Sequence, residues 1–247
     1  MSSKHIAPVT FLLVLLGVGY LVCAYIRFYR TIGEKNLVSP YKQTSFTLEN
    51  ARNVGVVNYV ALGDSLTAGV GSDDVKSTLV YQTALNLSSR YGRVAVVNLG
   101  QPGATSQDLI GDQLPQIAGL AAPHYITLLI GVNDVHNRVS VATYKSNLTY
   151  ILAELLAKTP AQIVLVNLPY LGSSDVVPLP FSSVLDTRTK QFNKVIDELG
   201  RNDRIKVVDL YSQTYELFKN DTGYYAADHF HPSGEGYLLF GGLINAD

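Results

Sequence analysis

The sequence predicts an α/β protein in which one doubly wound, five-stranded parallel sheet lies between two layers of helices, preceded by one transmembrane helix. From residue 54 onward, short apolar runs rich in β-branched residues alternate with longer segments of helical periodicity. Three of these runs end at a glycine followed by polar residues. Near the N-terminus, residues 6–26 contain no charged side chain. Alternation of strands and helices implies parallel pairing with right-handed crossovers, and therefore three layers.

The composition is that of a folded protein, with 47% hydrophobic and 16% charged residues among 247. A net charge of -1 argues against a general nucleic-acid binder, which would carry a basic surplus. The single cysteine, Cys23, lies in the N-terminal apolar stretch, so we expect no disulfide and no thiolate metal site in the folded part. Neither Gly-x-Gly-x-x-Gly after a strand nor a phosphate-binding loop motif occurs, which excludes dinucleotide and nucleotide binding of those types.

The apolar stretch at residues 6–26 would be ~31 Å long as a helix, which matches a hydrocarbon core of ~30 Å. Lys4 and Arg27 bracket it. A single membrane anchor at residues 1–30 is the favoured interpretation. A cleaved signal peptide fits less well because no small-x-small cleavage site follows. A lipid attached to Cys23, or a helix buried in the protein core, would also be compatible with so apolar a segment.

Charges around this segment leave its orientation open. Arg27, Arg30 and Lys35 outnumber Lys4 and the α-amino group, which favours a cytoplasmic C-terminal side. A long following domain can override that bias. We expect an extracytoplasmic domain.

Residues 31–53 are polar and contain Gly33 and Pro40, a composition typical of a linker. Residues 54–247 then form the folded domain. Its predicted strands are residues 56–62, 94–99, 125–130, 162–168 and 205–210. Its predicted helices are residues 78–91, 106–114 (capped by Ser106 or Asp108 and stopped by Pro115), 141–158, about twenty residues from Phe181 to Gly200, 211–219 and 234–243.

Polar residues gather where these strands end. The stretches Gly63-Asp64-Ser65, Gly100-Gln101-Pro102-Gly103 and Gly131-Val132-Asn133-Asp134 each follow a predicted strand. Because the carboxyl ends of parallel strands share one edge, all three loops should lie in one crevice. Asp228-His229-Phe230-His231 follows the fifth strand near the same edge, and one turn would let Asp228 reach His231.

These residues suit nucleophilic catalysis. A serine hydroxyl is a weak nucleophile until a base takes its proton. Ser65 would be the nucleophile, His231 the base and Asp228 the partner that orients it. The N–H groups of Ser65 and Gly100 and the side-chain amide of Asn133 could stabilise the oxyanion.

Three different interpretations of these residues stay open. Ser65 could be only a helix cap, and Asn133 only a turn residue. His229 and His231 could bind a metal with Asp228, although no further ligand is evident nearby. His5, His124 and His136 are expected to be incidental.

Together, Gly63-Asp64-Ser65-Leu66, Gly100, Gly131-x-Asn133-Asp134 and Asp228-x-x-His231 resemble the four sequence blocks of the SGNH (GDSL) esterase/lipase family, in order. The resemblance implies a flavodoxin-like sandwich, hydrolysis of esters or thioesters, no cofactor, and the residue roles given above. Asp64 and Asp134 are expected to be structural. Thr67 stands where the Gly-x-Ser-x-Gly elbow of other hydrolases has its second glycine.

The leading functional hypothesis is a membrane-tethered serine esterase acting on lipids, lysophospholipids or acylated glycans. Residues 170–185 are the predicted specificity element, where Val176, Val177, Leu179 and Phe181 could line an acyl pocket or simply cover the sheet. The competing hypotheses are a carbohydrate O-acetylesterase, an acyltransferase and, in another class, a non-catalytic ligand-binding surface protein. The oligomeric state is left open.

Overall fold

The computed structural model describes residues 6–34, 38–50, 55–170 and 176–244. Within them, the sheet has six strands in the order β1-β3-β2-β4-β5-β6. The strands are β1 (Ser45–Leu48), β2 (Val56–Gly63), β3 (Arg93–Asn98), β4 (Tyr125–Leu129), β5 (Gln162–Val166) and β6 (Ile205–Val208). All pairs among β2 to β6 are parallel, so the five predicted strands and their parallel arrangement are confirmed.

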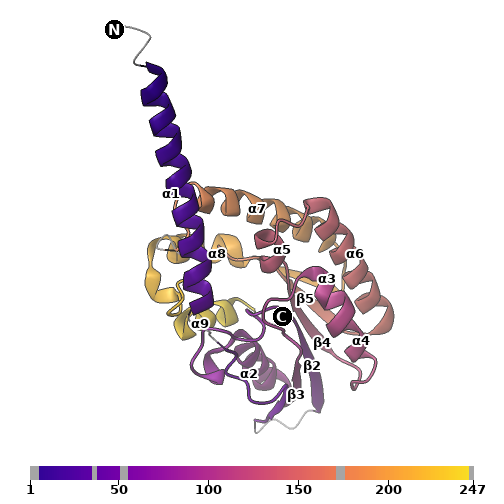
Figure 1. The fold of residues 1–247 in the computed structure, drawn as a ribbon. Helices are drawn as coiled ribbons and strands as arrows, with labels where there is room; N and C mark the ends of the chain where they lie inside the picture. Colours follow the sequence, from indigo (N-terminus) through magenta and orange to yellow (C-terminus); the bar gives the residue numbers. More distant parts are fainter. Residues whose placement is uncertain (1–5, 35–37, 51–54, 171–175, 245–247) are drawn as a thin grey trace.

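Two layers of helices cover the sheet, as the sequence predicts (Figure 1). On one face, α2 (Leu79–Tyr91) and α8 (Leu210–Asn220) pack against α9 (Gly234–Leu243). On the other lie α3 (Ser106–Asp108), α4 (Leu114–Ile117), α6 (Val141–Lys158) and α7 (Phe181–Leu199). The short helix α5 (Val132–His136), which the sequence analysis does not predict, contacts α7. The sheet is buried on both faces, which is why its strands are continuously apolar.

The structure differs from the predicted linker at residues 31–53. There, β1 pairs antiparallel with β3 and adds an edge strand to the parallel sheet. The ring of Phe46 stacks between Tyr41 and Tyr81, and the Ser39 hydroxyl donates to the Ala68 carbonyl at 2.5 Å. The folded domain therefore begins earlier in the chain than residue 54.

The predicted helix at residues 106–114 also differs. Thr105, rather than Ser106 or Asp108, caps α3, through a reciprocal capping box with Asp108. A π-helical turn at Leu109–Gln113 follows, and Pro115 lies in the first turn of α4 instead of ending the helix. Proline is tolerated there because the first helical N–H groups have no partner within the helix.

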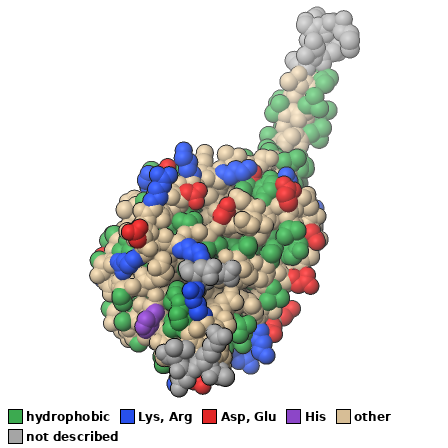
Figure 2. Space-filling view, turned by 180° about the vertical axis from the view of Figure 1, so that it is seen from behind, with side chains coloured by type: hydrophobic (Ala, Val, Ile, Leu, Met, Phe, Trp, Pro, Cys, Tyr) green, Lys and Arg blue, Asp and Glu red, His purple; other side chains and the backbone are tan. Residues whose placement is uncertain are grey.

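Helix α1 (Ile6–Glu34) contains a segment, Pro8–Phe28, that is long and apolar enough to cross a membrane by length and composition. Only 6% of its most apolar window is buried. The helix projects from the domain, with its C-terminal half beside the body (Figures 1 and 2). There the Tyr20 hydroxyl donates to the Leu179 carbonyl at 3.0 Å, and Ala24 is buried.

The connections of β2 determine where the crevice lies on the sheet. The chain runs from β2 to β3 on one side and then returns to β4 on the other. At such a reversal the loops at the carboxyl ends separate, and open α/β sheets bind ligands there. The loop after β2 begins at this point.

The buried side chain of Gln113 fixes that loop. Its amide nitrogen donates to the Gly63 carbonyl at 2.7 Å, and its oxygen accepts from the Gly63 N–H at 2.9 Å. We predict that Gln113→Ala lowers the free energy of unfolding by about 1–3 kcal/mol, because the buried Gly63 N–H loses its side-chain acceptor. The Gly63 carbonyl keeps a second donor, the Gln101 N–H at 3.1 Å. Urea unfolding of the full chain in detergent, followed by circular dichroism, measures this change.

Gln116→Ala is the matched control. Gln116 is exposed, and its side-chain amide donates to the nearby Asp112 carbonyl, so its loss should cost within about 0.5 kcal/mol. Equal destabilisation by the two variants would contradict the role assigned to Gln113.

Candidate active site

The loop that follows β2 presents Ser65 at the rim of the sheet. At Gly63 a Cβ atom would lie 2.2 Å from the Leu129 carbonyl oxygen, so only glycine permits this approach of β2 to β4. Beyond it, Asp64 accepts a hydrogen bond from the Leu66 N–H at 3.0 Å, which closes a turn around Ser65. Ser65 is 6% exposed and therefore lies inside the crevice rather than on the surface.

The structure brings Ser65, His231 and Asp228 together. The Nε2 atom of His231 lies 3.0 Å from the Ser65 hydroxyl oxygen, and its Nδ1 atom lies 2.5 Å from Oδ2 of Asp228. The other oxygen of Asp228 accepts the N–H groups of Phe230 and His231, each at 3.0 Å. The serine, imidazole and carboxylate form one continuous hydrogen-bonded series.

Asp228 is almost fully buried. Burial alone would raise its pKa, but the hydrogen bond and charge of His231, with the two backbone N–H groups, bring the pKa of Asp228 below its ordinary value. Asp228 is therefore ionised at neutral pH, as a partner that stabilises an imidazolium must be.

Gly71 allows the His231 loop to approach Ser65, and the sequence analysis does not identify it. It has a φ of +99°, and a Cβ there would lie 2.5 Å from the Pro232 carbonyl oxygen and 2.9 Å from the His231 Cβ. The buried Tyr237 hydroxyl donates to the Val70 carbonyl at 2.7 Å and holds the same loop. The stretch Gly69-Val70-Gly71, with two glycines close after Ser65, is the signal in the sequence that could have identified it.

Of the three predicted oxyanion donors, Gly100 already donates its N–H within the protein, and Asn133 donates one of its two amide N–H groups. The Gly100 N–H donates to the Asn98 side-chain oxygen at 3.0 Å, and the Asn133 amide donates to the Ala104 carbonyl at 2.9 Å. The Ser65 N–H and the second Asn133 N–H make no hydrogen bond within the described residues. These two donors are available as the structure stands.

Asp64 and Asp134 are buried carboxylates of a structural kind. Asp134 accepts both the hydroxyl and the N–H of Ser106, at 2.5 and 2.8 Å, which ties α5 to α3. Burial raises the pKa of Asp134. Burial, with a smaller contribution from the charge of Asp134, raises the pKa of Asp64 to about 7, and among the described residues Oδ2 of Asp64 has no hydrogen-bond partner.

His136, which the sequence analysis treats as incidental, lies next to the site. Its ring packs edge-on against Phe230 at 5.0 Å between centroids, and Phe230 packs against the His231 ring at 5.1 Å. Burial, and then the charge of His231, lower the pKa of His136 to about 4. Its place three residues after Asn133, on the same short helix, is the signal that could have identified it.

The remaining histidines have other positions. His124 accepts the Asn58 N–H at 3.0 Å at the amino end of the sheet, and His5 lies outside the described residues. Both ring nitrogens of His231 face Asp228 and Ser65, which suits a base better than a metal ligand. In the described part of the chain, no three His, Cys, Asp or Glu side chains group as a metal site.

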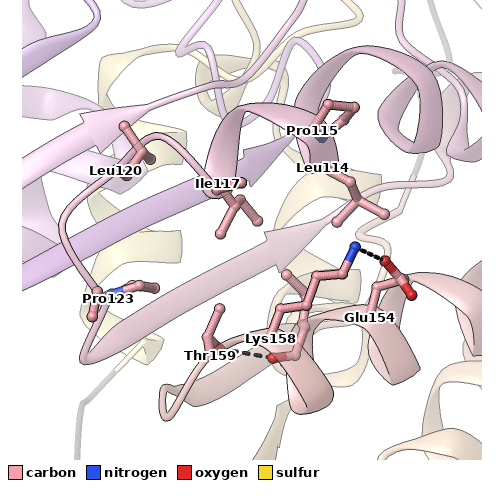
Figure 3. A pocket seen from close by; sticks show the side chains of 11 residues that line it. Leu114, Pro115, Ile117, Leu120, Pro123, Glu154, Lys158 and Thr159 are labelled. Carbon is pink, nitrogen blue, oxygen red and sulfur yellow. Dashed lines mark hydrogen bonds and ion pairs between the residues drawn. The ribbon is translucent and has the colours of Figure 1, made fainter.

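Three hollows differ in their relation to Ser65. A cavity of about 10 Å³ lies directly beside Ser65, lined by Leu66, Tyr170 and Phe230 among others. An apolar groove of about 350 Å³ lies between α1 and the start of α7, with His136 in its wall. A third, of about 370 Å³, lies beside Pro123, near the amino ends of β4 and β5 and therefore away from Ser65 (Figure 3).

The predicted specificity element is described only in part, because residues 171–175 lie outside the described residues. Val177 and Phe181 line the groove, and Val176 is buried. Leu179 is exposed and accepts the Tyr20 hydroxyl at its carbonyl.

Comparisons with known proteins show which family and fold the chain resembles. The model of the GDSL-like lipase/acylhydrolase family matches residues 61–239. A lipase/acylhydrolase from Enterococcus faecalis is 30% identical, with a TM-score of 0.59, over 76% of this chain and 93% of that one. Comparison with curated proteins finds no match.

Two further solved structures are similar in fold. The lipase Lip_vut3 from a goat rumen metagenome has a TM-score of 0.63 and 21% identity, over 77% of this chain and 96% of that one. A catalytic mutant of an acetylxylan esterase from Geobacillus stearothermophilus has a TM-score of 0.58 and 20% identity, over 78% and 94%.

Asp64 makes stability depend on pH. The pKa of Asp64 is about 7 in the fold against an ordinary 3.8. As pH rises, the carboxyl of Asp64 therefore loses its proton at a lower pH in the unfolded chain than in the folded one. The contribution of Asp64 to stability should therefore fall as pH rises from about 4 to about 7, by up to about 4 kcal/mol. Asn is uncharged at every pH, so we predict that the free energy of unfolding of Asp64→Asn rises progressively relative to that of wild type over this range. Urea unfolding of both proteins at several pH values measures the difference.

The exposed Asp73→Asn should keep the pH slope of the wild type. A stability difference between Asp64→Asn and wild type that stays constant from pH 4 to 7 would show that Asp64 ionises normally in the fold.

Proposed function

The chain belongs to the GDSL-like lipase/acylhydrolase family, and on that basis we propose that it hydrolyses esters with Ser65 as nucleophile, His231 as base and Asp228 as the residue that orients His231. Ester hydrolysis is the shared chemistry of that family and agrees with the resemblance seen in the sequence. The observation that carries the assignment of residues is the continuous series from the Ser65 hydroxyl through His231 to the ionised Asp228.

In the first step, the Ser65 oxygen bonds to the ester carbonyl carbon while its proton passes to Nε2 of His231. The carbonyl π pair moves to oxygen and forms the oxyanion. Asp228 stabilises the imidazolium produced. The Ser65 N–H and the second Asn133 N–H are the donors available to this oxyanion. One such donor contributes about 2.7–4 kcal/mol of transition-state stabilisation. The Gly100 N–H joins them if the Asn98 side chain turns away.

In the second step, the C–O bond to the alcohol breaks and the alcohol leaves with the proton from His231, which leaves an acyl-Ser65. Water then gives a proton to His231 as its oxygen bonds to the acyl carbon. The bond between that carbon and the Ser65 oxygen breaks, His231 returns the proton to Ser65, and the carboxylic acid leaves. Transfer to a sugar alcohol would follow the same course, with that alcohol in place of water. A thioester would react likewise.

The substrates we propose are acyl esters of lipids, lysophospholipids or acylated glycans, and the apolar groove beside His136 supports a lipid acyl chain. A second candidate is an O-acetylesterase acting on carbohydrate. It is favoured by the small size of the cavity at Ser65, about 10 Å³, which leaves no room for a long acyl chain at that position.

We further propose that α1 is a single-pass membrane anchor and that the catalytic domain lies outside the cytoplasm. The length and apolar composition of Pro8–Phe28 support the anchor, and a signal sequence would pass the same test. Digestion of the domain by a protease added outside intact cells checks the side, since full protection would overturn it.

The catalytic assignment predicts that Ser65→Ala lowers turnover of p-nitrophenyl acetate and longer esters by roughly 10⁴-fold or more, because the nucleophile is lost. Hydrolysis by the full chain in detergent measures this, with circular dichroism to check folding. Ser72→Ala is the matched control, since its hydroxyl bonds to the Asp74 carbonyl at 2.8 Å and not to His231. Turnover by Ser65→Ala equal to wild type would favour a non-catalytic binding protein.

A further inference from the structure

One stripe of α1 faces the catalytic domain. Leu21, Ala24, Tyr25 and Phe28 recur at helical spacing and lie on one side of the helix. Ala24 is 7% exposed, whereas Ile26, two residues later and on the other side of the helix, is 49% exposed. The other three residues of the stripe line the apolar groove. A segment that would only cross a membrane has no need of such a stripe against a soluble domain.

The opposite wall of the groove comes from the segment before α7 and from the first turns of α7. Its apolar members are Val177, Pro178, Pro180, Phe181, Val184 and Leu185. Two arginines, Arg138 and Arg188, also line the groove. Arg138 is exposed to solvent, whereas the Arg188 guanidinium donates to the Val139 carbonyl at 2.8 Å and to the Val135 carbonyl at 3.4 Å. That charge is therefore held against backbone, and the surface left to a ligand is predominantly apolar.

A series of aromatic ring contacts links the wall of the groove to the catalytic centre. Phe28 of α1 stacks on His136 with centroids 5.6 Å apart and planes 16° apart. Phe28 also meets Phe230 edge-on at 6.2 Å, and Phe230 contacts the His231 ring. An α1 side chain thus lies two ring contacts from the catalytic imidazole. His136 stays uncharged near neutral pH, which keeps this wall compatible with a hydrocarbon chain.

We propose that this groove binds the acyl chain of an ester drawn from the membrane, so that α1 forms part of the substrate site as well as anchoring the protein. The proposal rests on the esterase function proposed above. It names the substrate class as esters of a single aliphatic chain that reside in a bilayer. A volume of about 350 Å³ is within the usual range for small-molecule sites.

The position of the groove favours an acyl chain over other apolar occupants. Leu21, Tyr25 and Phe28 lie at the C-terminal end of the apolar span, where a helix leaves the hydrocarbon core. Beside them, Leu179 and Val184 are 66% and 54% exposed. These exposed apolar side chains, at the level where α1 would emerge, suit contact with a lipid surface and entry of a chain from it.

The test fills the groove from each wall in the full chain, reconstituted in lipid nanodiscs. Leu21→Trp acts from α1 and Val184→Trp acts from α7. Ile26→Trp is the control, because Ile26 is on α1 but does not line the groove. The measurement is kcat/KM for p-nitrophenyl octanoate divided by that for p-nitrophenyl acetate.

Both groove variants should lower this ratio about tenfold or more, since two methylene groups without apolar contact already cost about that much. Ile26→Trp should leave the ratio within about twofold of wild type. A ratio unchanged in Leu21→Trp and Val184→Trp would overturn the proposal while leaving the esterase intact.

A second readout separates this proposal from the catalytic one. Binding of dansyl-undecanoate is measured for the same three substitutions placed in Ser65→Ala protein, which needs no turnover. Weaker binding by about tenfold in the two groove variants but not in the control supports the groove even if no ester is hydrolysed. Equal binding in all three variants would overturn it.

Discussion

The hydrogen bond between Ser65 and His231 joins positions 166 residues apart and is the constraint on which the rest of the site depends. Three local features make it possible: the absence of a Cβ at Gly63, the absence of a Cβ at Gly71, and the Tyr237 hydroxyl that holds Val70. Each removes a steric or polar obstacle to two loops meeting over the rim of the sheet. The strands position the loops, and these contacts set their final separation.

Two carboxylates of similar burial have pKa values shifted in opposite directions in this site. Asp228 faces an imidazole and two backbone N–H groups, so its pKa is lowered despite burial. Asp64 has fewer compensating contacts and lies near Asp134, so its pKa is raised to about 7. The difference follows from the partners of each carboxylate and not from burial itself. It separates a residue suited to support a base from one that shapes the turn around Ser65.

Much of the fold was predictable because the buried parallel strands are apolar runs in the sequence, and several of these runs end at a glycine. The same pattern predicted the shared rim and the meeting of Ser65, His231 and Asp228. Strand β1 was missed because its partner strand β3 and the Tyr81 ring that packs on Phe46 are distant from it in sequence. Close approaches such as that at Gly71, and the groove wall supplied by α1, depend on tertiary distances that periodicity does not encode.

The most direct test of the central claim is the rate at which a fluorophosphonate probe labels Ser65, mapped by mass spectrometry. Gly71→Ala places a Cβ within 2.9 Å of the His231 Cβ, whereas Gly103→Ala has a similar positive φ but meets no atom within 4 Å. The account predicts labelling at Ser65 in wild type and Gly103→Ala, and labelling slowed by about 10²-fold or more in Gly71→Ala, because the base is displaced. Labelling at another residue, or at equal rates in the two glycine variants, would contradict it.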